Sequence, residues 1–147
     1  MRLGGWSALV VGLVAALLVT AGSSSAGAAV PRCFGKRATI VVSEPGVVTR
    51  GTSGDDVIVG SSGADDIRGR GGNDRICGRG GPDSIDGGAG RDRINAGGGS
   101  DTVTGGKGRD YLVGSTGADL LKGMSGADTI SGGKGDDRLR GGSGDDI

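Results

Sequence analysis

Residues 105–113 have the sequence Gly-Gly-Lys-Gly-Arg-Asp-Tyr-Leu-Val, and the same pattern returns every nine residues. From Gly51 to Ile147 the chain divides without insertion into ten full repeats and part of an eleventh. Glycine occupies position 4 of every repeat, aspartate occupies position 6, and an aliphatic residue occupies position 8 wherever that position is present. Such strict periodicity is typical of a solenoid built from one repeating unit.

The repeat itself predicts the shape of each coil. Glycines at positions 1 and 4 favour a tight turn over positions 1–6, and positions 7–9 predict a short strand. Because side chains alternate along a strand, the aliphatic residue at position 8 faces inward while positions 7 and 9, which are mostly polar, face solvent. Two repeats then close one 18-residue coil, and coils stack as parallel strands about 4.8 Å apart. We therefore expect an all-β protein, a parallel β-roll of about eleven nonapeptide repeats.

Composition excludes several classes of function. The chain has 36 glycines among 147 residues and only 2% aromatic residues, so a large apolar core is excluded. Its formal net charge is +0, which leaves no basic excess for binding nucleic acid. Histidine is absent and Glu44 is the single glutamate, so Ser-His triads and imidazole-ligated zinc lack their central group. We expect that the protein is not an enzyme.

Residues 1–28 have the layout of a secretory signal peptide. Met1 and Arg2 precede an apolar stretch from Trp6 to Val19, and small residues follow up to a predicted cleavage after Ala28. The alternative is an uncleaved membrane anchor, but this stretch is interrupted by glycine and shorter than the roughly 20 apolar residues that span a bilayer. The sequence thus predicts a secreted, extracellular protein whose mature form makes no membrane contact.

Folding of the repeats requires more than apolar burial. Each repeat buries one aliphatic side chain, whereas the ordering of nine residues, many of them glycine, opposes folding. Stacked coils also place the position-6 carboxylates close enough to repel one another. A cation held between turns would convert this repulsion into ligation, and carboxylate and carbonyl oxygens favour calcium over magnesium, which demands a tight octahedron. We therefore expect several calcium ions and folding that is coupled to their binding.

The predicted side-chain ligands are the aspartates at position 6. Odd-numbered repeats place them at one edge of the roll and even-numbered repeats at the other. They are Asp56, Asp65, Asp74, Asp83, Asp92, Asp101, Asp110, Asp119, Asp128, Asp137 and Asp146.

The consensus Gly-Gly-x-Gly-x-Asp-x-aliphatic-x resembles the repeats-in-toxin (RTX), or haemolysin-type calcium-binding, nonapeptide. Residues 105–113 and 132–140 match it at every fixed position, and the resemblance covers residues 51–147. The resemblance implies a β-roll with calcium ions held between adjacent turns on both edges. It also implies that the position-6 aspartates supply carboxylate ligands and that turn residues at positions 1–5 supply carbonyl ligands.

Departures from the repeat occur inside and at both ends of the array. Position 2 is often not glycine, so we expect calcium affinity to vary among sites; these residues are Thr52, Ser61, Arg70, Arg79, Ser115 and Met124. Residues 29–50 contain a degenerate repeat that has slipped register and lacks the aspartate, and we interpret them as an N-terminal cap. The chain stops in mid-repeat at Ile147, which predicts either a longer sequence or end-to-end self-association at an uncapped coil.

Two cysteines lie outside the predicted interior. Cys33 precedes the repeats and Cys77 occupies position 9 of the third repeat. In an exported protein such a pair predicts one disulfide bond, which would tie the leading segment over the first coil. The alternative is two independent thiols.

The sequence as a whole predicts a secreted, non-enzymatic calcium-binding β-roll. Two alternatives stay open. One is a calcium-dependent adhesion or matrix module whose arginine-bearing outer face binds cell-surface polysaccharide or another protein. The other is the repeat fragment of a longer secreted enzyme or toxin, although the roughly 20 residues between the predicted signal and the repeats are too few for a catalytic domain.

Overall fold

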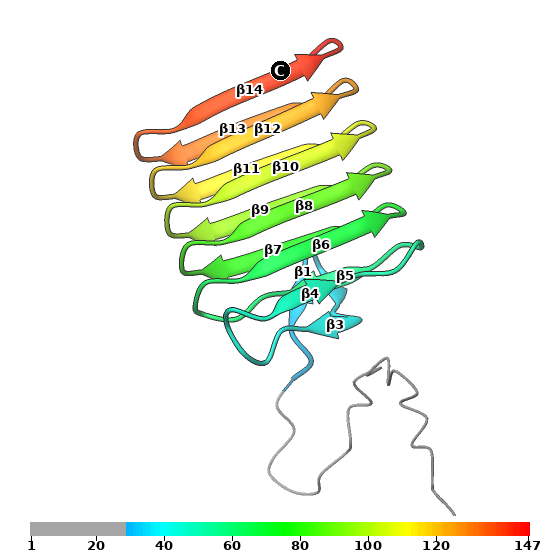
Figure 1. Cartoon of the computed structure of the whole chain (residues 1–147), viewed down its shortest axis with the longest axis vertical. Helices are drawn as coiled ribbons and strands as arrows, with labels where there is room; N and C mark the ends of the chain where they lie inside the picture. Colours follow the sequence, from blue (N-terminus) through cyan, green and yellow to red (C-terminus); the bar gives the residue numbers. More distant parts are fainter. Residues whose placement is uncertain (1–28) are drawn as a thin grey trace, which may run out of the picture.

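The computed structural model describes residues 29–147, so the predicted signal peptide lies outside the described residues. These residues form a stack of coils with the N-terminal segment at one end and β14 at the other (Figure 1). Two six-stranded parallel sheets make up the stack, in the orders β4-β6-β8-β10-β12-β14 and β3-β5-β7-β9-β11-β13. The predicted all-β parallel roll is confirmed. Within residues 29–147 no helix has the length and hydropathy needed to cross a membrane.

The strands alternate between the two sheets along the chain. The first sheet contains β4 (Val48–Arg50), β6 (Asp66–Gly71), β8 (Ser84–Ala89), β10 (Thr102–Lys107), β12 (Leu120–Ser125) and β14 (Arg138–Ser143). The second contains β3 (Ile40–Val41), β5 (Val57–Val59), β7 (Arg75–Gly80), β9 (Arg93–Gly98), β11 (Tyr111–Thr116) and β13 (Thr129–Lys134). Within these two sheets every pairing between neighbouring strands joins residues 18 apart, as in Ile76 with Ile94, so one coil contains two repeats.

The predicted division between strand and turn is wrong in one respect. Full-length strands run from position 7 through position 3 of the next repeat, so the turn is confined to positions 4–6. The glycine-rich positions 2 and 3 continue the parallel ladder, for example where Gly106 and Lys107 pair with Gly88 and Ala89. The glycines at positions 1 and 4 predicted a turn across these positions, but backbone pairing to the adjacent coils outweighs the weak strand preference of glycine.

The interior contains the residues that the alternation predicts. Ile58, Ile67, Ile76, Ile85, Ile94, Val103, Leu112 and Leu121 at position 8 are all at most 2% exposed. At the C-terminal end of the stack the prediction fails, because Leu139 lies on the outermost strand β14 and is 48% exposed. End-to-end self-association at this coil stays a prediction.

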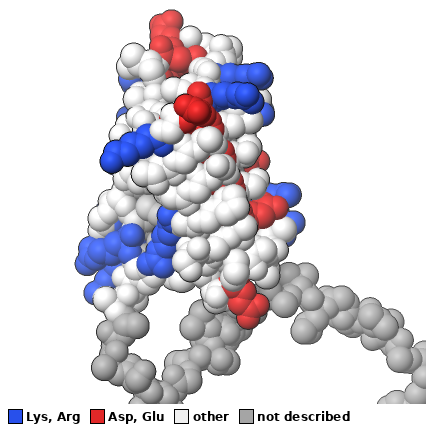
Figure 2. Space-filling view, turned by 90° about the vertical axis from the view of Figure 1, so that its left-hand side faces the viewer, with Lys and Arg blue, Asp and Glu red and all other residues white. Residues whose placement is uncertain are grey.

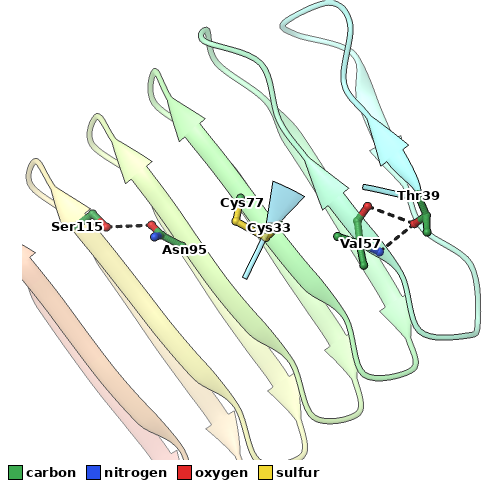
Figure 3. Close-up of a disulfide and its surroundings, with 6 residues drawn as sticks. All are labelled: Cys33, Thr39, Val57, Cys77, Asn95 and Ser115. Carbon is green, nitrogen blue, oxygen red and sulfur yellow. Dashed lines mark hydrogen bonds between the residues drawn. A yellow bond between two sulfur atoms is a disulfide. The ribbon is translucent and has the colours of Figure 1, made fainter. Parts of the chain in front are cut away.

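Residues 38–50 form part of the first coil, and the expected slip in register is wrong. Ile40 pairs with Ile58 and Thr49 pairs with Ile67, which is the same 18-residue offset as in the rest of the roll. The Thr39 hydroxyl joins this coil to the next, since its Oγ1 accepts a hydrogen bond from the Val57 N–H and donates one to the Val57 carbonyl (Figure 3). This coil does lack the aspartates, because the positions 18 residues before Asp56 and Asp65 are Ala38 and Val47.

A short antiparallel hairpin, β1 (Arg32–Cys33) with β2 (Lys36–Arg37), covers the outer face of β5. The predicted disulfide between Cys33 and Cys77 is confirmed and links this hairpin to β7, with the two Cα atoms 5.7 Å apart (Figure 3). Val57 and Val59 are buried beneath the hairpin, although their positions 7 and 9 face solvent elsewhere in the roll.

From Gly72 onward, position 4 of the repeat requires glycine for two reasons. Gly108 has φ 126°, a conformation that L side chains rarely adopt, and a Cβ atom there would overlap the Gly90 carbonyl oxygen of the preceding coil. We expect Gly108→Ala to destabilise the folded protein by roughly 2–4 kcal/mol, measured by thermal unfolding in calcium. Gly80→Ala is the matched control, because its φ is not positive and the nearest atoms to a new Cβ are 3.9 Å away. Equal effects of the two substitutions would contradict this account.

Candidate metal centre

The position-6 aspartates form two columns, one along each edge of the roll. Asp56, Asp74, Asp92, Asp110, Asp128 and Asp146 lie on the odd-repeat edge, and Asp65, Asp83, Asp101, Asp119 and Asp137 lie on the even-repeat edge. All except Asp137 and Asp146, which belong to the last coil, are buried. On the edge that faces left in Figure 1, acidic atoms appear in a broken line between white surface, with basic side chains to either side (Figure 2).

One carboxylate oxygen of each later aspartate joins successive coils. The backbone N–H of Asp74 donates to Oδ1 of Asp92 at 2.9 Å, and the N–H of Asp92 donates to Oδ1 of Asp110 at 2.8 Å. The same bond recurs on the other edge, where the N–H of Asp83 donates to Oδ1 of Asp101 at 2.8 Å. These bonds place the carboxylates in a continuous ladder inside the turns.

The second carboxylate oxygen has no donor. Oδ2 is buried without a hydrogen-bond partner in Asp74, Asp83, Asp92, Asp101, Asp110, Asp119 and Asp128. An ionised oxygen in this position is strongly destabilising unless a positive charge compensates it. Seven equivalent oxygens of this kind are an arrangement that a series of cations would satisfy.

Backbone oxygens lie beside these carboxylates. The point that a Cβ atom on Gly87 would occupy is 2.5 Å from Oδ2 of Asp92 and 2.6 Å from the carbonyl oxygen of Gly105 in the next coil. Glycine at position 1 therefore leaves room where oxygens from two coils converge. Calcium accepts carbonyl and carboxylate oxygens together, so this donor set fits calcium.

Side chains alone do not make a complete site. Among residues 29–147 no three acidic, histidine or cysteine side chains cluster closely enough to hold a metal ion. A calcium ion on either edge would need carbonyl ligands from the turns in addition to the aspartates, as the repeat pattern predicts.

The first two aspartates differ from the rest. Oδ2 of Asp56 accepts hydrogen bonds from the Thr52 N–H at 2.7 Å and the Thr52 hydroxyl at 3.0 Å. The Ser61 N–H and hydroxyl donate in the same way to the two carboxylate oxygens of Asp65. Threonine and serine at position 2 thus donate hydrogen bonds to Asp56 and Asp65, the first aspartates of the two columns. Sequence reasoning missed this role, although both hydroxyl residues stood out among the position-2 departures.

Burial and mutual repulsion hold the carboxylates of the middle coils toward their protonated form. Burial raises the pKa of Asp83 and Asp92 to about 7 and that of Asp74 and Asp110 to about 6. The backbone N–H bond to each Oδ1 opposes this shift, and neighbouring carboxylates increase it further. Burial also raises the pKa of Asp101. Without a cation, ionisation of these ladders at neutral pH therefore opposes folding.

Fold and site together define a parallel β-solenoid with buried carboxylate ladders along both edges. A family model described as the RTX calcium-binding nonapeptide repeat (4 copies) matches residues 50–85, 78–112 and 113–147. The chain belongs to this family, and the family confirms calcium as the ion that such repeats bind. No curated protein and no solved structure gave a match to the chain.

Proposed function

We propose that the chain is a secreted, non-catalytic β-roll that binds several calcium ions between its turns and folds only as it binds them. The observation that carries this proposal is the set of seven buried Oδ2 atoms without a donor, repeated along both edges. Each lies at the same point of the repeat, so successive coils offer equivalent oxygens. Position-6 aspartates are the proposed side-chain ligands, and the turns would add carbonyl oxygens.

Export is part of the same proposal. The pattern of residues 1–28 favours a cleaved signal peptide, and the Cys33–Cys77 bond is of a kind that persists outside the cytosol. Extracellular fluid also supplies the calcium that weak, oxygen-only sites require.

Replacement of one aspartate in the middle of the array tests the stacked sites. Asp92 accepts from the coil before it and donates to the coil after it, so we expect Asp92→Asn to reduce the calcium bound per chain by more than one ion. Equilibrium dialysis with metal analysis at several calcium concentrations measures this number. The matched control is Asp86→Asn, which removes the same charge from the exposed outer face and should leave the number unchanged. Loss of a single ion in Asp92→Asn would contradict sites shared between coils.

A further inference from the structure

A polar groove lies on the odd-repeat edge, and its lining includes Asp55 and the column aspartates Asp74, Asp92 and Asp110. Its cavity measures about 510 Å³, and the side chains that matter for its chemistry are Asn73, Arg75, Arg91, Arg93, Arg109 and Tyr111. Position 5 of successive odd turns supplies Asn73, Arg91 and Arg109, and position 7 supplies Arg75, Arg93 and Tyr111. The groove therefore follows the axis of the stack, with two rows of side chains that repeat once per coil.

None of the four arginines in this groove forms an ion pair within 4.0 Å, although four aspartates share the lining with them. In the part of the chain that the structure describes, the one ion pair within 4.0 Å joins Arg68 to Asp66, outside the groove. Nε of Arg75 is buried without a hydrogen-bond acceptor. Arg75 and Arg93 also lie directly opposite each other on β7 and β9, and like charges in such a cross-strand pair are destabilising. With calcium on the aspartates that share the lining, such a row of stacked, unpaired cations is suited to an anionic ligand.

The Arg93 guanidinium is held in place before any ligand arrives. Its Cζ atom lies 4.6 Å from the centre of the Phe34 ring and 5.5 Å from that of Tyr111, within the range of cation–π contacts. The two rings pack edge to face with centres 6.5 Å apart, and Phe34 follows Cys33 of the disulfide. Because the Cys33–Cys77 bond anchors this hairpin to the roll, less side-chain freedom is lost when Arg93 binds an anion.

The chemistry of the groove selects among anionic partners. Guanidinium groups bind carboxylates through paired hydrogen bonds, and the rows repeat about every 4.8 Å, which suits a linear chain of anionic groups. The groove contains no leucine, isoleucine, valine, methionine or phenylalanine, so it lacks the apolar centre of a typical protein interface.

We infer that this groove binds an acidic polysaccharide, a linear glycan that carries carboxylate groups along its length. Asn73, Tyr111 and Thr129 would add hydrogen bonds to the sugar hydroxyls. Calcium on the aspartates that line the groove would leave the four arginines as its dominant charge, so the inference rests on the calcium-loaded roll of the proposed function. Binding of this kind would make the protein a calcium-dependent adhesion module.

The test measures binding of polygalacturonate by the full-length mature chain in millimolar calcium at low ionic strength. We expect binding of polygalacturonate, no binding of neutral dextran, and at least a tenfold weaker affinity in the double variant Arg91→Ala/Arg109→Ala, whose residues lie on exposed turns. The matched control is Arg138→Ala/Arg140→Ala on β14, which removes the same charge outside the groove and should retain affinity.

Circular dichroism in calcium accompanies each measurement and separates the two proposals. A chain that gains no strand signal in calcium would contradict the proposed function. Three results would each overturn the inference that the groove binds an acidic glycan. They are failure of the folded chain to bind polygalacturonate, an equal loss of affinity in both double variants, and binding of poly-glutamate or duplex DNA as tight as that of polygalacturonate.

Discussion

Excess EDTA is expected to abolish the β-sheet circular dichroism signal of the purified chain, and millimolar calcium is expected to restore it. The reason lies in the interior, where the roll buries one position-8 aliphatic side chain per repeat but also seven carboxylate oxygens without donors. Removal of the compensating cation leaves those charges close together in a poorly solvated space. Binding and folding then occur together, because the unfolded chain contains no site.

Titration with calcium after EDTA treatment measures this coupling, with the strand signal followed against free calcium. Magnesium at equal concentration is the control. We expect it to restore little of the strand signal, because irregularly placed carbonyl and carboxylate oxygens do not provide the octahedral coordination that magnesium requires. Identical melting curves with and without EDTA would refute the coupling.

In the absence of calcium, the chain is expected to become more stable as the pH falls from about 7.5 to about 5. The pKa of Asp83 and Asp92 is about 7 in the folded chain and that of Asp74 and Asp110 about 6, against 3.8 for an unperturbed aspartate. Between these values the folded chain binds more protons than the unfolded chain, so stability decreases as the pH rises through this window.

Circular dichroism of the EDTA-treated chain at pH 5 and at pH 7.5 provides the comparison, with more strand signal expected at pH 5, and Asp92→Asn should weaken the pH dependence because an amide does not titrate there. With calcium present the direction should reverse, since protons compete with the ion for the same oxygens. An EDTA-treated chain whose stability rises between pH 5 and pH 7.5 would show that the buried carboxylates do not control folding.

Much of the roll follows from one period in the sequence. Nine residues between equivalent glycines, with two repeats to a coil, determine which side chains face inward, and Ile76 and Ile94 occupy the interior as the alternation requires. The same period places Asp74 and Asp92 one above the other. Because each repeat contacts the same parts of its neighbours, local pattern and three-dimensional position are nearly equivalent in a solenoid.

Tertiary structure decided the features that depend on contacts between unlike segments. Strands extend through glycines that resembled turn residues because adjacent coils supply their hydrogen bonds. Thr52 donates to Asp56 in the first turn of its column, and the hairpin at Cys33 places Phe34 against Arg93, far away in sequence. A repeat pattern carries no information on where the stack begins or on what a non-repeating segment covers, since those depend on packing between parts of the chain that do not share the period.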